Sequence, residues 1–489
     1  MLFNSIDFAI FLPAVFLLYW FVFHRDCRRQ NLFLVAASYV FYGWWSWKFL
    51  GLIAATSLFS WLSGAGILSI RARGFAPEKE RRLTVAVAAL SIAINLGILG
   101  FFKYYNFFAQ SFADAFALFG RRMDVRSLKI ILPVGISFYT FQALGYTIDV
   151  VRKKIEPAKD IVSFFAFVSF FPQLLAGPIE RASNFLAQMQ RPRTFDYAKS
   201  VDGLRQTLWG LFKKIAVADT CAIVANSAFA NCETAHASQL LAGVVFFAFQ
   251  IYGDFSGYSD IAVGCSKLFG FNLMQNFNYP YFSRDIAEFW RRWHISLSTW
   301  FRDYLYIPLG GSSVGKAKQI RNTLVIFLVS GFWHGANWTF VVWGAYHALL
   351  FLPLVLLKKN RRHTNTIAER RLFPSAGEAL QAVATFLLVS VGWVFFRAET
   401  IGIAFDYLRN MISLEALHAA AGIFQHGAIW TCLFMLLVEW IGRTDKHALE
   451  KFGLGWRRVF RIAFYSMLVL CLLHFAKPEG QHEFIYFQF

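Results

Sequence analysis

The chain has 489 residues, of which 57% are hydrophobic and 19% aromatic, whereas only 16% are charged. So few charged side chains cannot cover the surface of a water-soluble globule of this length, and the composition therefore indicates a membrane protein. The formal net charge of +19 would suit a nucleic-acid partner. The Lys and Arg residues lie in short clusters between apolar runs, however, as in membrane proteins, so we expect no nucleic-acid partner.

Long apolar runs recur along the chain. A transmembrane helix needs about 20 predominantly apolar residues, and runs of this kind occur at 7–23, 31–47, 49–70, 83–102, 161–177, 239–252, 323–357, 379–396, 427–441 and 460–475. A transmembrane β-barrel would instead show alternating segments of about ten residues. We expect an all-α, polytopic integral membrane protein with about 10–13 transmembrane helices. The first run lacks a cleavage pattern, so we expect it to remain as a helix.

Clusters of Lys and Arg between the runs predict an orientation in the membrane. They follow the first run, the third run and the stretch near 131–151, and they fill the loop at 442–459: Arg25, Arg28, Arg29, Arg71, Arg73, Lys79, Arg81, Arg82, Arg152, Lys153, Lys154, Arg443, Lys446, Lys451, Arg457 and Arg458. Cytoplasmic loops are enriched in Lys and Arg, so we expect these loops in the cytoplasm and both termini outside it. Segment 178–322 mixes basic and apolar residues, and the number of its spans stays open.

Linkers, low-complexity tracts and fixed-period repeats are not visible in the sequence, so we expect one membrane domain over 1–489. Within it, region 131–345 carries charged and amide side chains inside apolar sequence, between flanking helices in 1–130 and 346–489. Polar residues at membrane depth usually face a cavity, a partner or a path. The six cysteines form no Cys-x-x-Cys pair, so neither a metal site nor a disulfide framework is indicated.

The stretch Asp285–Tyr306 mixes three acids, three arginines and many aromatic side chains. One interpretation is an amphipathic helix lying at the membrane surface and anchored by its Trp and Arg side chains. The other is a funnel lining for a polar, anionic substrate, in which His294 takes part together with charged neighbours. These neighbours are Arg291, Arg292 and Asp303.

The stretch Ser330–His347 places two histidines inside a long apolar run. An ionisable residue at that depth is a candidate functional group. We favour His334 because Gly331 and Gly335 flank it, and glycines four apart let another helix or a ligand approach the backbone closely. Asn337 is expected on the same helical face. His347 is expected to satisfy a hydrogen bond in the core instead.

A third polar island is Tyr252–Asp260, which contains Asp254, Ser256 and Asp260. It is either a bend with capping acids or a cavity wall whose carboxylates hold arginines. Serine-nucleophile, Walker and His-Glu-x-x-His patterns are absent from the sequence, which leaves hydrolase, nucleotide triphosphatase and metalloprotease functions without support.

These motifs together resemble the membrane-bound O-acyltransferases, in particular the branch that acts in alginate O-acetylation. The resemblance covers nearly the whole chain and rests on Pro133–Gln142, Ala176–Ile179, Asp254-Phe-Ser-Gly-Tyr-Ser-Asp260, Glu288–Trp300, Arg302-Asp-Tyr-Leu-Tyr306, Trp333-His-Gly-Ala-Asn337 and the closing Phe484-Ile-Tyr-Phe-Gln-Phe489. It implies membrane helices around a central funnel, in a bacterial cytoplasmic (inner) membrane. His334 matches the signature histidine of the family and His294 its second histidine.

The resemblance also implies an activity and its partners. The donor would be acetyl-CoA from the cytoplasm, with no cofactor or metal. The acceptor would be an extracytoplasmic polysaccharide, reached through an acetylesterase-like (SGNH) transferase outside the cell membrane. D-alanyl transfer to teichoic acid is an alternative within the family, and a transporter or a scaffold that only recruits a partner is an alternative outside it.

The C-terminal hexapeptide Phe484–Phe489 has two interpretations. Tyr and Phe side chains suit the outer membrane interface, where they would act as an anchor. Alternatively, the tail folds back into the mouth of the funnel, and the Tyr486 hydroxyl carries the acyl group before the partner takes it. A relay is attractive because about 30 Å of hydrocarbon separates the two sides of the membrane.

Overall fold

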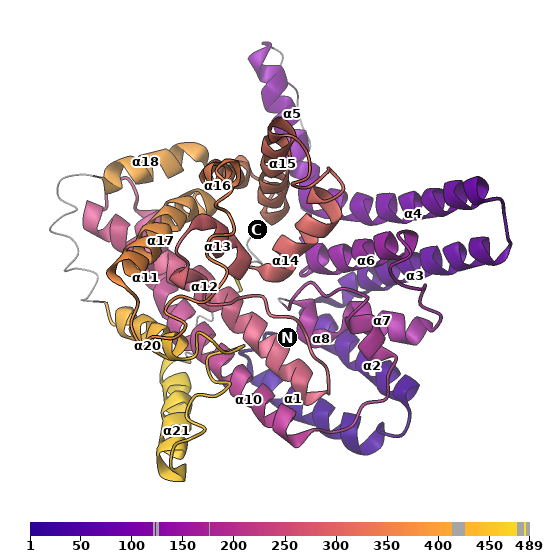
Figure 1. Ribbon diagram of the computed structural model, residues 1–489, viewed down its shortest axis with the longest axis horizontal. Helices are drawn as coiled ribbons and strands as arrows, with labels where there is room; N and C mark the ends of the chain where they lie inside the picture. The colour runs from indigo at the N-terminus through magenta and orange to yellow at the C-terminus, as the bar shows by residue number, and fades with distance from the viewer. Residues whose placement is uncertain (121–122, 124–126, 176, 413–425, 477–483, 486–489) are drawn as a thin grey trace. The chain divides into compact units, whose positions relative to one another are not determined.

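The computed structural model describes residues 1–120, 123, 127–175, 177–412, 426–476 and 484–485. Over these residues the secondary structure consists of helices and contains no strands (Figure 1). The all-α prediction is therefore confirmed. The backbone contacts divide the chain into two compact units, the first formed by Met1–Lys199 with Ser266–Leu273 and the second by Ser200–Cys265 with Met274–Phe489. The prediction of one domain over the whole chain stays a prediction.

The first unit contains the N-terminal helices. They are α1 (Ile6–Leu17, continued by η1, Leu18–Val22), α2 (Cys27–Ser46), η2 (Trp47–Phe49), α3 (Leu50–Ala72), α4 (Pro77–Leu99, continued by η3, Gly100–Tyr104), α5 (Tyr105–Leu118), α6 (Ile136–Val151), α7 (Ile161–Ser169), α8 (Phe171–Leu174) and α9 (Phe185–Met189). Helices α3, α4 and α6 pack on one another. The approach of α6 to α3 requires glycine at position 64, because the Tyr146 hydroxyl occupies the place of a Cβ atom there.

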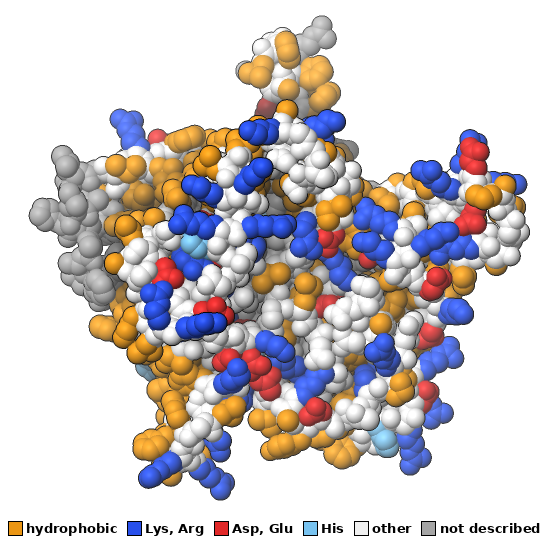
Figure 2. All heavy atoms as spheres, viewed as in Figure 1, with side chains coloured by type: hydrophobic (Ala, Val, Ile, Leu, Met, Phe, Trp, Pro, Cys, Tyr) orange, Lys and Arg blue, Asp and Glu red, His pale blue; other side chains and the backbone are white. Residues whose placement is uncertain are grey.

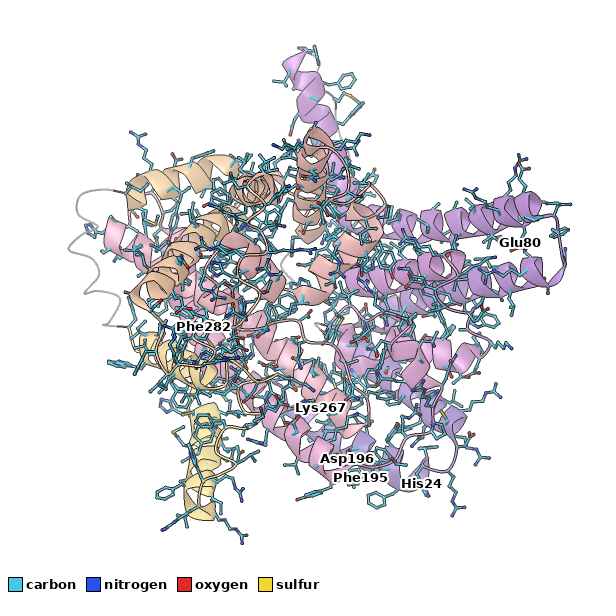
Figure 3. All side chains as sticks on the ribbon, in the orientation of Figure 1. His24, Glu80, Phe195, Asp196, Lys267 and Phe282 are labelled. Carbon is cyan, nitrogen blue, oxygen red and sulfur yellow. The ribbon has the colours of Figure 1, made fainter. Side chains whose placement is uncertain are left out.

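The second unit holds the remaining helices. They are α10 (Tyr197–Phe212, which begins in the first unit), η4 (Lys213–Ala218), α11 (Asp219–Ala230), α12 (Ala237–Leu268), η5 (Pro280–Phe282), α13 (Ile286–Arg292), α14 (Ile295–Phe301), η6 (Arg302–Tyr306), α15 (Lys316–His334), α16 (Trp338–Leu356), α17 (Ala376–Arg397), α18 (Ile401–Met411), α20 (Ala428–Ile441) and α21 (Arg458–Phe475). The central stretch of α12, Phe246–Cys265, is almost entirely buried. Side chains such as Phe282, labelled in Figure 3, join η5 to α20 by packing on Trp440 at 5.2 Å between ring centroids.

Close approach of α10 and η4 to α12 depends on glycines of α12. A Cβ atom on Gly257 would lie 2.8 Å from the Gly210 carbonyl oxygen and 3.1 Å from the Lys214 nitrogen, and one on Gly253 would lie 3.0 Å from the Lys213 carbonyl oxygen. Larger side chains would force the two segments apart. The glycines therefore bring the lysines of η4 against α12.

Six helical segments among the described residues are long and apolar enough to cross a membrane. They are Cys27–Ala72, Pro77–Leu118, Ala237–Leu268, Trp338–Leu356, Ala376–Arg397 and Arg458–Phe475, and Ile6–Val22 and Ala428–Ile441 are shorter apolar helices. Six segments is fewer than the expected number of helices, about 10–13, but Cys27–Ala72 has 46 residues and contains both α2 and α3. One reason is that the apolar run at 161–177 does not form one spanning helix: α7 ends at Ser169 and the short α8 follows, with Pro172 in its first turn.

Apolar side chains cover much of the outside of these helices. Leu380 of α17 is 71% exposed, and Val459 and Leu473 of α21 are 75% and 70% exposed. Figure 2 shows such side chains over α18 and over α21, where Lys and Arg side chains lie among them. Exposed apolar helix surfaces of this extent are typical of a protein in contact with lipid.

Candidate functional site

The candidate site is a pair of buried histidines in the second unit. His334 is the last residue of α15, and His294 lies between α13 and α14. Their side chains are 3% and 1% exposed, and the centroids of the two rings are 6.4 Å apart. The two residues that the sequence selects for chemistry therefore lie side by side, although they belong to different helices.

His334 is held at the turn of a helical hairpin. Helices α15 and α16 pack tightly because Gly331 and Gly344 leave no room for a side chain: their Cβ atoms would collide with the carbonyl oxygens of Phe340 and Phe327. The prediction that Gly331 permits close approach of another helix is thereby confirmed. The tight hairpin fixes the end of α15, and with it His334.

Asn337 does not share a helical face with His334, contrary to the prediction. Helix α15 ends at His334, and Asn337 is the N-cap of α16, where its side chain accepts a hydrogen bond from the Thr339 nitrogen at 3.0 Å. The side-chain amide also donates to the Glu399 carbonyl oxygen at 2.9 Å. The chain breaks here because an Asn side chain caps a new helix better than it continues an old one.

His294 has an unusual backbone conformation. Its φ and ψ are 42° and 55°, in the left-handed region that non-glycine residues seldom adopt. Main-chain bonds on both sides hold it there, because Ile295 donates to the Asn276 carbonyl oxygen and Asn278 to that of Arg292. Backbone strain of this kind persists where the surroundings impose it and is common at functional sites.

Aromatic side chains enclose both histidines. The ring centroid of His334 lies 5.1 Å from that of Trp343 and 5.4 Å from that of Phe396. The ring of Phe255 meets His294 edge-on, with 4.6 Å between the centroids. Burial lowers the pKa of His294 to about 3, so this imidazole is neutral near pH 7. A neutral imidazole in an apolar enclosure can accept a proton or a hydrogen bond but does not supply a fixed positive charge.

His347 also packs on Trp343, with 5.1 Å between the two ring centroids. It is fully buried, and both of its ring nitrogens lack a hydrogen-bond partner among the described residues. The expectation that this histidine satisfies a hydrogen bond in the core is therefore wrong for the part of the chain that the structure describes. Its ring contributes packing between Trp343 and Trp290, which lies at 5.0 Å.

Arg292 of α13 and the preceding Arg284 belong to a buried ion cluster. Arg284 and Arg292 both bind the Glu288 carboxylate, at 3.0 and 2.9 Å, and all three side chains are buried. Arg292 is therefore not an exposed membrane anchor, and the location of this stretch at the membrane surface stays a prediction. Arg291 is exposed and donates to the main-chain oxygens of Asn360 and His363, each at 2.6 Å, which ties the loop after α16 to α13.

Asp303 lies in the polar segment that follows α14. Its carboxylate accepts a hydrogen bond from the neighbouring Arg302 at 2.8 Å, in the turn η6. The contact joins adjacent residues and fixes the local turn. A part for Asp303 in lining a funnel stays a prediction.

The polar island on α12 is neither a bend nor a holder of arginines. Residues 252–260 continue the helix without interruption, and their acids bind lysines of η4. Asp260 pairs with Lys213 at 2.6 Å, and Asp254 pairs with Lys214 at 2.9 Å. Ser256 accepts a hydrogen bond from Lys213 at 2.9 Å.

Lys213 and Lys214 were not predicted as site residues, although the sequence contains a pattern that points to them. Lys213-Lys214 interrupts an apolar segment, and charged residues in such a segment usually have a partner inside the protein. Lys213 also lies 3.8 Å from Glu439 of α20, which accepts a hydrogen bond from Tyr252. Lys213 therefore links η4, α12 and α20.

The C-terminal segment reaches the same region. Phe484 and Ile485 are 0% and 1% exposed, and Phe484 packs on Tyr258 at 4.5 Å. Tyr486, the candidate acyl carrier, lies outside the described residues. The described part of the tail is therefore inserted in the second unit, beside the α12 residues that adjoin His294.

Among the described residues, no group of three or more His, Cys, Asp and Glu side chains is placed to hold a metal ion. The arrangement can supply one or two imidazole rings to a reactant inside an apolar enclosure. Such a site can remove a proton from a hydroxyl group and shield the reacting atoms from water.

Comparisons with known proteins agree with this chemistry. The family model of the membrane-bound O-acyltransferase family matches residues 157–388. A probable alginate O-acetylase of Pseudomonas putida is 36% identical over the full length of both chains, and one of Azotobacter vinelandii is 41% identical over 84% of this chain and 78% of its own. A peptidoglycan O-acetyltransferase of Helicobacter pylori is 30% identical over 100% of this chain and 98% of its own.

Apolar helices around two buried histidines, in a chain with these relatives, define a multi-pass membrane enzyme that transfers acyl groups. The chain belongs to the membrane-bound O-acyltransferase family. Within that family, its full-length similarity is to proteins named as O-acetylases.

Proposed function

We propose that this enzyme moves an acetyl group from cytoplasmic acetyl-CoA across the bacterial cytoplasmic membrane for O-acetylation of an alginate-like polysaccharide. The observation that carries the proposal is the buried pair His294 and His334 at 6.4 Å, in a chain that matches alginate O-acetylases over most of its length. We take the acceptor from the names of those relatives. The second unit, which contains both histidines, is the proposed place of the chemistry.

In the proposed reaction, the oxygen of a hydroxyl group attacks the thioester carbonyl carbon of acetyl-CoA. His334 takes the hydroxyl proton as the attack proceeds, and collapse of the tetrahedral intermediate breaks the carbon–sulfur bond. The departing thiolate takes the proton from His334. The products are an acetyl ester and free coenzyme A, and no cofactor or metal is needed.

His294 has a different part in this proposal. It is neutral and packed edge-on against Phe255, so it can orient the donor or the hydroxyl by a hydrogen bond without competing for the proton. Asp254, Ser256, Asp260, Arg291, Arg292 and Asp303 would act indirectly, through the shape and charge of the surrounding protein.

The tail supplies the proposed relay. Phe484 and Ile485, the two residues before Tyr486 in the sequence, are buried beside Tyr258 and Asp254 in the unit that holds both histidines. Tyr486 would accept the acetyl group, and an extracytoplasmic acetylesterase-like (SGNH) transferase would then pass it to the polymer. Activation of the phenol, whose pKa is ordinarily about 10, requires a base such as His334 within hydrogen-bond reach.

D-alanyl transfer to teichoic acid is a second candidate. A teichoic acid D-alanyltransferase of Bacillus subtilis is 27% identical over 54% of this chain and 69% of its own. The relatives named as O-acetylases match more of the chain at higher identity, which favours acetyl.

The test is turnover of acetyl-CoA by the purified chain in detergent or lipid nanodiscs, measured as release of the coenzyme A thiol. We expect release that depends on the protein and stops in the His334→Ala variant. A scaffold or transporter would give no thiol release above the rate of spontaneous hydrolysis. D-alanyl transfer would show as labelling of the protein by a D-alanyl thioester but not by acetyl-CoA.

A further inference from the structure

The C-terminal segment, of which Phe484 and Ile485 are described, is joined to α12 by a hydrogen bond from a main-chain nitrogen to a side-chain carboxylate. The Ile485 nitrogen donates to the Asp254 carboxylate at 2.7 Å, and both partners are buried. A buried carboxylate that accepts a main-chain N–H fixes the position and direction of the donor segment more strictly than apolar packing does. The bond therefore sets where the tail enters the protein.

A buried lysine holds this carboxylate in place. The Lys214 ammonium group lies 2.9 Å from the other oxygen of Asp254 and 2.8 Å from Asp219, and Lys214 is 1% exposed. A single lysine thus bridges the acid that holds the tail and an acid at the start of α11. Burial of such charges is costly, and replacement by apolar side chains is often neutral or stabilising. A role beyond stability would explain their presence.

The local backbone is shaped to deliver Lys214 to this position. Residues 213–218 form η4, a wide turn of the π type, and such turns in helices are frequent at functional sites. The turn directs two consecutive lysines into the interior, Lys213 toward Asp260 and Lys214 toward Asp254. Gly257 is required here, because its missing Cβ would lie 3.1 Å from the Lys214 nitrogen.

Aromatic contacts then lead from the tail to the histidine pair. The ring of Phe484 lies 4.5 Å from Tyr258 and 5.9 Å from Phe255, and Phe255 in turn touches His294 at 4.6 Å. One ring therefore separates the inserted tail from His294. A shift of the tail by a few ångströms would change what lies next to this histidine.

We propose that Asp254, Lys214 and Tyr258 form a binding slot for the C-terminal segment of this same chain, and that Asp254 and Lys214 are positioning residues that keep the segment beside His294. In the slot, Tyr258 packs on the aromatic ring of Phe484, and Asp254 accepts the main-chain N–H of the next residue, Ile485. Its importance for acyl transfer rests on the proposed function, but occupancy of the slot by the tail can be measured without any acyl donor.

The first experiment measures exposure of the tail in the full-length protein. In a background whose six native cysteines are replaced, Ile485→Cys is reacted with a bulky polyethylene-glycol maleimide under native conditions. We expect slow modification when Asp254 is intact and modification about 10- to 100-fold faster in Asp254→Ala, because a hydrogen bond to a charged group is lost. Asp254→Asn, whose amide oxygen still accepts a hydrogen bond, should fall between the two.

The control is Tyr252→Phe, which removes a buried hydrogen bond to Glu439 from the same helix without touching the tail. It should leave the modification rate of Ile485→Cys unchanged. If Ile485→Cys were modified equally slowly with Asp254 intact and with Asp254→Ala, the proposal would be overturned. Modification of Ile485→Cys as fast with Tyr252→Phe as with Asp254→Ala would also overturn it, because the faster rate would then reflect general loosening of the core.

The second experiment tests whether the slot matters for the reaction. Ile485→Pro removes the N–H that Asp254 accepts, whereas Ile485→Val keeps it together with a similar apolar side chain. We expect Ile485→Pro to lower kcat for acyl transfer at least tenfold with little change in KM for acetyl-CoA, and Ile485→Val to retain activity. If both variants transfer acetyl normally, the slot only anchors the tail, and its part in positioning is refuted. If wild-type protein turns over no acyl-CoA, the proposed function fails, while the modification experiment still decides whether the slot exists.

Discussion

The imidazole rings of His294 and His334 are 6.4 Å apart, and each is fixed by a different device of the backbone. His334 ends a helix in a hairpin that glycines hold tight, and His294 is locked in a left-handed conformation. The backbone therefore sets the position of both rings. A catalytic base and a positioning group benefit from such preorganisation, because the geometry need not be created at the moment of reaction.

His294 should affect donor binding more than the chemical step. We expect His294→Asn to raise KM for acetyl-CoA about tenfold, the cost of one ordinary hydrogen bond, with a smaller change in kcat. Asn tolerates the left-handed conformation, so this variant keeps the backbone while it removes the imidazole. Steady-state kinetics of the purified variant measure the effect. Unchanged kinetics in a folded protein would leave His294 with a structural part alone.

Gly331 should be essential for the hairpin. We expect Gly331→Ala to lower the free energy of unfolding by about 1–3 kcal/mol, because the new methyl group would overlap the Phe340 carbonyl oxygen. Gly377→Ala is the matched control, since nothing lies within 4 Å of its missing Cβ. Thermal unfolding in detergent compares the two. A Gly331→Ala protein as stable as the Gly377→Ala protein would contradict the close packing of α15 on α16.

The topology prediction concerns the ends of the chain. Because Lys and Arg mark cytoplasmic loops, the loops at 71–82 and 442–459 should be cytoplasmic and both termini extracytoplasmic. Fusions of alkaline phosphatase and of a fluorescent protein after Phe489 distinguish the two sides. We expect phosphatase activity and no fluorescence. Fluorescence alone would place the C-terminus in the cytoplasm.

Tyr486 should be required through its hydroxyl group. We expect Tyr486→Phe to abolish acetylation of the polymer while the protein level stays normal, because the variant keeps the ring and removes only the acyl acceptor. Mass spectrometry of wild-type protein, incubated with acetyl-CoA in the absence of the partner transferase, should detect acetyl on Tyr486. Full activity of Tyr486→Phe would leave the tail as an anchor.

The helical class and the Gly331 contact could be predicted from apolar runs and glycine spacing. The family motifs pointed to His294 and His334, which the structure places near each other, and their chemical roles stay predictions. Each of these features depends on residues that are close together in the sequence. The ends of long helices were harder to predict. In the sequence, Asn337 looks like a residue inside the same helix as His334, and only the structure shows that it caps α16.

The partners of the buried charges could not be predicted. In one of the two interpretations of the α12 island, its acids hold arginines. Instead, Asp254 and Asp260 bind lysines from η4, which lies about 40 positions earlier in the chain. Arg292 was expected near a surface or a funnel, but it is buried against Glu288. The pairing of each buried acid with a basic residue depends on how glycines bring distant segments together. A local sequence pattern does not determine that pairing.

The most direct test of the account compares two histidines that flank the same tryptophan. His334 and His347 each lie 5.1 Å from Trp343, so His334→Phe and His347→Phe make equivalent changes in one aromatic cluster. With both proteins purified at equal stability, we predict that His334→Phe, like His334→Ala, loses about 10²- to 10⁴-fold in release of coenzyme A from acetyl-CoA, as expected when a general base is removed. His347→Phe should retain activity. Wild-type rates in His334→Phe, or an equal loss in both variants, would contradict the claim that His334 is the base.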